Sequence, residues 1–227
     1  MAVFDFDKVE EYVQSSGEGF NFLKLADDRW SAKVRFMYGP GEIFKGYAVH
    51  NVSQDPMKPK YIPCLRELGQ PLDVCPLCKA SNPVVAQFYI PLYVLSITKV
   101  INGITQPEEP VNQVMLFQRG KTFKGALDSV IRQSGGTPLV NNIFNIVRNG
   151  KMKDPKTQYL VEFAGRDNTT LDQLPEFPEI FGSYILPNVS YDEMLQYVNN
   201  QPISGIVPRT ISANPINTNQ ISPNVPF

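Results

Sequence analysis

The chain has 227 residues, of which 42% are hydrophobic and 19% are charged, with 20 prolines and 15 glycines. A chain of this size buries enough apolar surface to fold without a metal or disulfides, and its many turn-forming residues favour short strands over long helices. No run of eighteen or more uncharged apolar residues occurs, and residues 1–13 carry four acids where a signal peptide needs positive charge, so we expect a soluble, cytosolic protein without a membrane partner.

The net charge of −1 conceals a division of the chain into acidic and basic stretches. Residues 1–28 hold seven acids and two bases, a net charge of −5, and residues 157–200 hold seven acids and one arginine, a net charge of −6. Residues 29–156 hold seventeen Lys or Arg and eight Asp or Glu, a net charge of +9. A basic middle between acidic flanks is typical of a core that contacts a polyanion, although a chance fluctuation of charge produces the same pattern.

In the first part of the chain, the hydrophobic pattern predicts one short helix and three strands. The helix, at residues 4–13, belongs to an acidic N-terminal arm, residues 1–18. The strands show alternating apolar residues and are expected at residues 20–25, 31–38 and 43–49. The first two are predicted to form a hairpin around residues 26–28, and the third leads to His50.

The second part of the chain predicts four further strands and two helices. The strands are expected at residues 88–101, 111–119, 143–149 and 158–164, where aromatic and β-branched residues gather. Amphipathic spacing predicts helices at residues 122–133 and 191–198. From residue 201 to 227 the chain is rich in Pro, Asn, Ser and Thr and almost uncharged, which predicts a disordered tail.

Short antiparallel strands with one helix among the later ones favour a β-rich α+β fold. A five-stranded barrel of the oligonucleotide-binding type, the OB-fold, is the arrangement we expect. This core is predicted at residues 19–165, with a metal-binding subdomain at about residues 50–80, and an acidic segment follows at residues 166–200.

All three cysteines and the only histidine lie within 29 consecutive residues, in the order His50, Cys64, Cys75 and Cys78. A Cys-x-x-Cys turn places two thiolates on one metal, and Zn²⁺ prefers four N and S donors in a tetrahedron. Four protein ligands leave no coordination position for water or substrate. The spacing therefore predicts one structural Zn²⁺ rather than a catalytic one.

Other chemistries use the same residue types. A dithiol redox motif needs an activated Cys75 near a helix start in a βαβ unit and gives no role to Cys64 or His50. A nucleobase deaminase needs a Glu two residues after the histidine, where Val52 stands. Three core cysteines beside an unrelated histidine remain as the simplest alternative, which the clustering disfavours.

Basic and aromatic residues are interleaved through the predicted core, as single-stranded nucleic acid binding requires. A cationic groove follows the phosphates and aromatic rings stack on bases. For each residue alone, core packing of the ring or solvation of the charge is the simpler interpretation; the prediction depends on their joint placement. The candidates for contacts with nucleic acid are Lys33, Arg35, Tyr38, Lys45, Tyr47, Lys58, Lys60, Tyr61, Arg119, Lys121, Phe123, Lys124, Arg148, Lys151 and Lys153.

With the His-Cys-Cys-Cys array and the opening strands at residues 19–28 and 33–36, the chain resembles phage single-stranded-DNA-binding proteins of the kind found in T-even phages. The resemblance covers about residues 18–165. It implies an oligonucleotide-binding barrel and a zinc subdomain whose ligands correspond to the four residues of the array. It also implies a protein that coats exposed strands during DNA replication, recombination and repair, in the cytoplasm of an infected bacterial cell.

The two ends of the chain differ from that family. The family has a basic N-terminal arm that supports cooperative binding, whereas residues 2–14 are acidic here, and the family's C-terminal acids continue where this chain has none after Glu193. The final Pro226 and Phe227 resemble the end of bacterial single-strand-binding tails, which predicts docking on a replication protein.

We therefore expect a binding protein and not an enzyme. The first alternative is a protein-interaction or recombination-mediator protein whose zinc knuckle docks another protein, which predicts weak and salt-insensitive DNA binding. The second is a zinc-dependent nuclease, which needs a carboxylate cluster or an open metal position.

Overall fold

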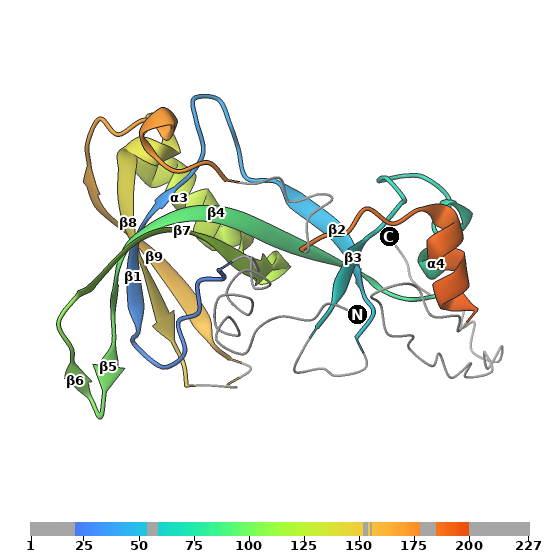
Figure 1. Ribbon diagram of the computed structural model, residues 1–227, viewed down its shortest axis with the longest axis horizontal. Helices are drawn as coiled ribbons and strands as arrows, with labels where there is room; N and C mark the ends of the chain where they lie inside the picture. The colour runs from blue at the N-terminus through green and yellow to red at the C-terminus, as the bar shows by residue number, and fades with distance from the viewer. Residues whose placement is uncertain (1–20, 54–58, 152–153, 155, 178–184, 200–227) are drawn as a thin grey trace, which may run out of the picture.

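The computed structural model describes residues 21–53, 59–151, 154, 156–177 and 185–199. Figure 1 shows two lobes connected by the long strand β4 (Val84–Thr98), which extends through both. Aromatic and β-branched residues dominate this strand, as expected for an extended segment that is largely buried. In the part of the chain that is described, no helix is long and apolar enough to cross a membrane.

The larger lobe, which we call the core lobe, contains the C-terminal part of β4 and most other strands. Its strands are β1 (Ser31–Phe36), β5 (Val100–Ile101), β6 (Ile104–Thr105), β7 (Glu109–Gly120), β8 (Asn142–Asn149) and β9 (Gln158–Arg166). Its helices are η3 (Lys121–Phe123), α3 (Lys124–Ser134), η4 (Leu139–Asn141) and η5 (Leu171–Gln173). The helix α3 ends at Gly135, whose φ of 61° lies in the left-handed region that favours glycine.

The smaller lobe, which we call the metal lobe, contains short elements and the N-terminal part of β4. These elements are β2 (Gly46–Asn51), β3 (Tyr61–Pro63), η2 (Leu72–Val74), α2 (Pro76–Lys79) and α4 (Tyr191–Val198). The N-terminus of α4 is capped reciprocally: Ser190 Oγ accepts from the backbone N–H of Glu193, while the Glu193 carboxylate accepts from the backbone N–H of Ser190.

The sheet is antiparallel and β4 organises it, because its two edges pair with different strands. Along one edge, residues 84–88 pair with β2 and residues 92–98 pair with β1. Along the other edge, residues 87–97 pair with β7. The order of the main path is β3-β2-β4-β1-β8-β9, with β7 added on β4.

The prediction of a β-rich fold with few helices is confirmed, and so are most of the predicted elements. The predicted helix at residues 191–198 coincides with α4, and the helix predicted at residues 122–133 is α3 with its preceding turn. The sheet is open, since no ladder joins β7 to β9 among the described residues, so a closed barrel is not present.

The predicted hairpin of residues 20–25 with residues 31–38 is wrong. Residues 21–23 instead run beside β7, where Leu23 N–H donates to the carbonyl of Leu116 and Leu116 N–H donates to the carbonyl of Asn21. β1 pairs with β4 instead. The alternation of apolar residues indicates which face of a strand is buried but not which strand lies beside it, so it could not specify this pairing. The N-terminal arm and the tail from residue 201 lie outside the described residues.

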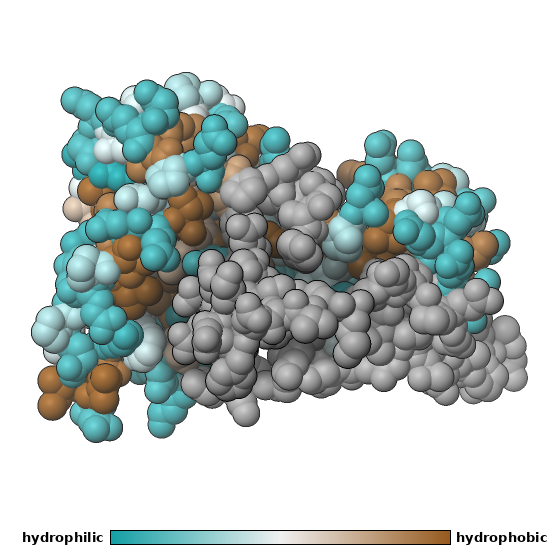
Figure 2. All heavy atoms as spheres, viewed as in Figure 1, coloured by the Kyte–Doolittle hydropathy of each residue, from teal (hydrophilic) through white to brown (hydrophobic). Residues whose placement is uncertain are grey.

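The core lobe packs around a single large apolar cluster. Phe36, Phe117 and Phe144 are fully buried in it, and Phe36 meets Phe144 edge to face with ring centroids 5.3 Å apart. At the far end of this lobe, the β5–β6 hairpin carries Ile101 and Ile104 in exposed positions, which Figure 2 shows as a hydrophobic tip.

Candidate metal centre and nucleic-acid interface

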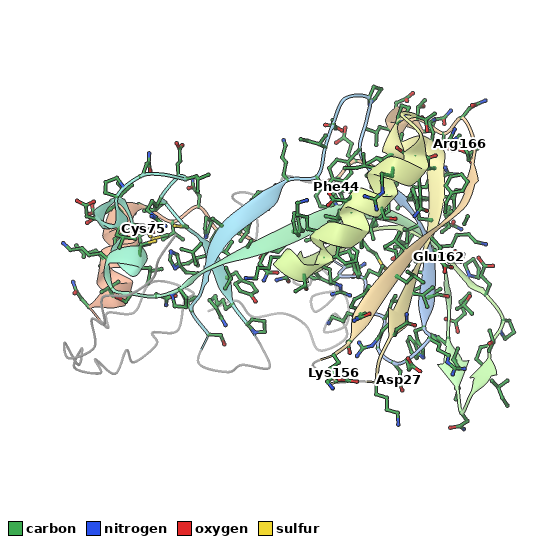
Figure 3. All side chains as sticks on the ribbon, turned by 180° about the vertical axis from the view of Figure 1, so that it is seen from behind. Asp27, Phe44, Cys75, Lys156, Glu162 and Arg166 are labelled. Atoms are coloured by element: carbon green, nitrogen blue, oxygen red, sulfur yellow. The ribbon has the colours of Figure 1, made fainter. Side chains whose placement is uncertain are left out.

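The four donors predicted from the sequence converge in the metal lobe. The donor atoms of His50, Cys64, Cys75 and Cys78 all lie within 4.8 Å of one another. His50 Nε2 is 3.4 Å from Cys75 Sγ and 3.6 Å from Cys78 Sγ, and the sulfurs of Cys64 and Cys78 are 3.5 Å apart. Figure 3 shows the sulfurs of this group beside α2, where Cys75 is labelled.

These separations fit a tetrahedral metal ion. With metal–sulfur bonds of about 2.3 Å and metal–nitrogen bonds of about 2.0 Å, tetrahedral angles place two sulfurs about 3.8 Å apart and nitrogen and sulfur about 3.5 Å apart. The distances from His50 Nε2 agree with this within a few tenths of an ångström. The cluster can therefore hold a metal ion through four protein ligands.

Three separate parts of the backbone bring the ligands together. His50 lies within β2, whose neighbour β3 ends just before Cys64. Cys75 is the residue before α2, with Pro76 at the first helical position, and Cys78 lies inside this helix. The backbone N–H of Lys79 donates to the carbonyl of Cys75 over 3.0 Å and closes the Cys-x-x-Cys turn.

The protonation of the ligands is set by burial and by backbone donors. Burial lowers the pKa of His50, which favours the neutral imidazole that binds metals. Burial acts to raise the pKa of Cys75, but hydrogen bonds from the backbone at Cys78, Leu65 and Leu77 outweigh it and the pKa falls. Burial, followed by the neighbouring Cys64, raises the pKa of Cys78 to about 12.

Two buried residues next to the candidate ligands, Asn82 and Met194, were not predicted. The Nδ1 atom of His50 and the Oδ1 atom of Asn82 are both inaccessible to solvent, and neither makes a hydrogen bond of good geometry within the described residues. In many metal sites the second nitrogen of a ligating histidine donates to a nearby acceptor that orients the ring, and Asn82 carries a buried acceptor without a partner among the described residues. Met194 of α4 places its sulfur 3.8 Å from Cys75 Sγ and covers the cluster.

Three of the residues predicted to contact nucleic acid have buried side chains. Arg35 is 5% exposed; its guanidinium binds both oxygens of Asp167 and donates to the carbonyl of Val140. Tyr38 and Phe123 belong to the core cluster, and burial raises the pKa of Tyr38 well above its usual value. The fold places these side chains on the inner side of the core lobe, where Tyr38 and Phe123 pack in the apolar cluster and the charge of Arg35 is paired.

Three other basic candidates have partners within the protein. The guanidinium of Arg148 donates to the backbone carbonyls of Leu25, Gly150 and Lys151, which is a structural role at the β8–β9 connection. Lys33 forms an ion pair with Glu108 over 2.9 Å, and Lys124 forms one with Asp128 over 2.8 Å. The charges of the two lysines are thus balanced within the protein, and the donors of Arg148 are used by backbone carbonyls.

The remaining described candidates are open to solvent or half-buried. Lys45, Lys121 and Lys151 are exposed; the half-buried ones are Tyr47, Lys60, Tyr61 and Arg119. The candidates Lys58, Lys153, Pro226 and Phe227 lie outside the described residues.

One face of the sheet carries a row of tyrosines, only part of which was predicted. Tyr47 of β2 meets Tyr89 of β4 with ring centroids 5.8 Å apart, and Tyr61 of β3 packs against the same cluster. Tyr93 follows Tyr89 by four residues and is therefore on the same face of β4. We call Tyr47, Tyr61, Tyr89 and Tyr93 the tyrosine face.

The tyrosine face is partly covered by apolar residues from elsewhere in the chain. Leu116 and Leu186 are buried against Tyr89, and Phe22 and Phe177 pack beside them. Tyr89 is 2% exposed, whereas Tyr47, Tyr61 and Tyr93 are half-buried and retain accessible surface.

Comparisons with protein-family models, curated proteins and solved structures found no match for the chain.

Proposed function

We propose that this protein binds single-stranded DNA without catalysing a reaction, and that its metal centre holds a structural Zn²⁺. The proposal rests first on the tyrosine face, where Tyr47, Tyr61 and Tyr93 present half-buried rings on one side of the sheet. Lys45 and Lys60 directly precede the strands that carry two of these rings. Rings for stacking beside cations for phosphates are what a single strand requires.

The strand connectivity supports an oligonucleotide-binding barrel as the scaffold. The strands β1, β4, β7, β8 and β9 follow one another in five-stranded order, with α3 between the third and the fourth. Antiparallel ladders join β1 to β4, β4 to β7, β1 to β8 and β8 to β9. OB-folds are partly open Greek-key barrels that bind nucleic acid on the second and third strands and on the first and fourth loops.

In this scheme the second and third strands are β4 and β7. The first loop is the connection at residues 37–83, which contains the four candidate metal ligands and all of the metal lobe except α4 and the start of β4. The fourth loop is the β8–β9 connection with Lys151 and Lys156. The metal would then hold one wall of the binding site in place.

Zinc is the metal that best suits the donor set. One imidazole and three thiolates in a tetrahedral arrangement match structural zinc sites, and hard cations such as Mg²⁺ prefer oxygen. When bound, the ion supplies cross-links between β2, the end of β3 and α2. A single zinc per chain, measured by elemental analysis of protein purified without added metal, is the expected result.

The binding proposal is tested by fluorescence anisotropy with a labelled thirty-base oligo-dT strand and a matching duplex at two salt concentrations. We expect preference for the single strand and weaker binding at the higher salt. Tyr47→Leu and Tyr61→Leu should each weaken binding about tenfold, since a stacked base contributes about 1–3 kcal/mol. Phe163→Leu, an exposed ring on β9, is the matched control. Equal affinity for duplex and single strand would refute the proposal.

A second candidate function is docking of another protein by the metal lobe. It is favoured by exposed apolar residues there, since Leu68 and Leu72 are fully or largely exposed and Leu195 of α4 is 40% exposed. This function predicts weak, salt-insensitive DNA binding, which the same anisotropy experiment distinguishes.

A further inference from the structure

The core lobe has an open pocket where the sheet fails to close. It lies between the end of β7 and the start of β9, beneath the turn that leads into α3, and has a volume of about 520 Å³. This size is typical of small-ligand sites and is sufficient for a nucleotide. The argument for its ligand depends on Arg119, Lys156, Thr122 and Gln158, all of which line it.

Arg119 is held rigidly at the wall of the pocket. Its guanidinium carbon lies 3.8 Å from the ring centroid of Phe117 and 3.7 Å from that of Tyr159, so the group contacts both rings of this edge-to-face pair. Its Nη1 donates to the carbonyl of Gln118 over 2.7 Å. The Nε atom is inaccessible and makes no hydrogen bond within the described part of the chain. Burial lowers the pKa of Arg119 to about 10.

The buried residue Arg35 has a counter-charge that the half-buried Arg119 lacks. Arg35 is also desolvated, and its charge is balanced by Asp167. Arg119 forms no ion pair with any carboxylate of the described residues, although removing a guanidinium from water without a counter-charge is unfavourable. A desolvated cation beside an open pocket therefore favours an anion as its partner.

The other polar residues that line the pocket are basic or uncharged, as an anion site requires. Lys156 supplies an ammonium group, Thr122 a hydroxyl and Gln158 an amide, and no Asp or Glu is among the lining residues. Figure 3 shows Lys156 at the loop end of the core lobe, in the other lobe from Cys75. The pocket is thus separate from the metal centre.

We propose that this pocket binds the phosphate group of a nucleotide, with Arg119 as its main donor and Lys156 and Thr122 as supporting donors. This inference depends on the proposed function in one respect, the source of the phosphate. We assign that phosphate to the backbone of single-stranded DNA. A free nucleotide has the same chemistry, and the experiment separates the two sources.

The first arm measures the binding of thymidine 5′-monophosphate by calorimetry, with thymidine as the ligand without phosphate. Loss of a charge-assisted hydrogen bond weakens binding by about 10- to 100-fold, which is the effect expected for Arg119→Gln. Lys156→Gln changes an exposed loop residue that cannot unfold the protein, and should produce a smaller loss. Arg132→Gln removes a positive charge from an exposed position of α3 outside the pocket and should leave the Kd unchanged.

The second arm measures the binding of the thirty-base oligo-dT strand by the same variants across a range of salt. If the phosphate belongs to a strand, Arg119→Gln should lower the slope of log K against log salt by about one, while Arg132→Gln should not. Loss of monophosphate binding with unchanged strand binding assigns the pocket to a free nucleotide. If the wild-type protein binds the monophosphate but no strand, the pocket stands and the proposed function fails. The pocket proposal is overturned if Arg119→Gln and Lys156→Gln behave as wild type in both arms.

Discussion

The core lobe and the metal lobe are stabilised in different ways. The buried cluster of the core lobe comprises 17 residues from strands and from α3, including three fully buried phenylalanines. The buried cluster around the metal site comprises seven of the described residues, and two of these are Cys75 and Cys78; a separate cluster around Tyr89 lies on the other face of β2. A cluster of that size is too small to hold a folded unit by apolar burial alone. We therefore expect the part of the metal lobe around the four candidate ligands to depend on a bound ion, and the core lobe to be stable without one.

Removal of the metal is expected to have the largest effect, and to affect one lobe only. Structural zinc contributes about 10–16 kcal/mol of apparent binding free energy, which in such sites is folding free energy. Chelation should therefore expose the backbone amides of β3, α2 and α4 to hydrogen exchange, and leave those of β1 and β8 protected. Mass spectrometry of exchange with and without chelator measures this. Simultaneous loss of protection in both lobes would break the comparison.

A cavity in the core lobe is the complementary perturbation. Phe144 is fully buried and meets Phe36 and Phe163 edge to face, so Phe144→Ala should lower the free energy of unfolding by about 3–5 kcal/mol. At low denaturant, the variant should still hold one metal per chain, because none of the four ligands touches this site. Denaturant unfolding and metal analysis are the measurements. Loss of the metal from the folded variant would show that the two lobes are coupled.

The ion pair of Arg35 with Asp167 offers a smaller, pH-dependent test within the core lobe. The hydrogen bond from Arg35 lowers the pKa of Asp167 to about 2, below its usual value. The stabilisation is therefore present above pH 4 and is lost as the pH falls towards 2. Asp167→Asn should destabilise the protein by about 1–2 kcal/mol at pH 7, a modest figure because Asp167 is 45% exposed.

The pH dependence provides the control for that prediction. At pH 7 the wild-type protein should be more stable than Asp167→Asn, and the two should converge as the pH falls from 4 to 2. Thermal unfolding across this range measures the difference. A gap that stays constant with pH would contradict the assigned pKa.

Local features of the chain were predictable, and partners far apart in sequence were not. The metal ligands lie close together in the sequence and their residue types allow few other uses, so His50 and the three cysteines could be identified. The helix α4 was predicted with its bounds because amphipathic spacing is a local signal. The pairing of β1 with β4 was not predicted, because alternation specifies a face and not a neighbour.

The candidate contacts with nucleic acid show the same limit. Arg35 is predicted as a phosphate contact from its strand, and only the fold reveals that its counter-ion is Asp167, 132 residues away. The tyrosine face joins residues of β2, β3 and β4, so Tyr89 and Tyr93 were missed while Tyr47 and Tyr61 were chosen for their neighbouring lysines. Knowledge of the register in which β2, β3 and β4 pair would have shown that these tyrosines share one face of the sheet.

The smallest expected effect separates a paired lysine of the core lobe from an unpaired one at the start of β2. Lys33 donates to both carboxylate oxygens of Glu108, over 2.9 and 3.2 Å, and both side chains are partly exposed. Lys33→Gln should therefore change the free energy of unfolding by less than about 1 kcal/mol. It should also leave oligo-dT affinity and its salt dependence nearly unchanged, because the lysine charge is already balanced by Glu108.

Lys45 forms no ion pair with the described residues, and Lys45→Gln should lower the salt slope by about one. Equal losses from the two variants would mean that the strand displaces Glu108 from Lys33, and that phosphate contacts lie on β1 of the core lobe as well as beside β2 of the metal lobe.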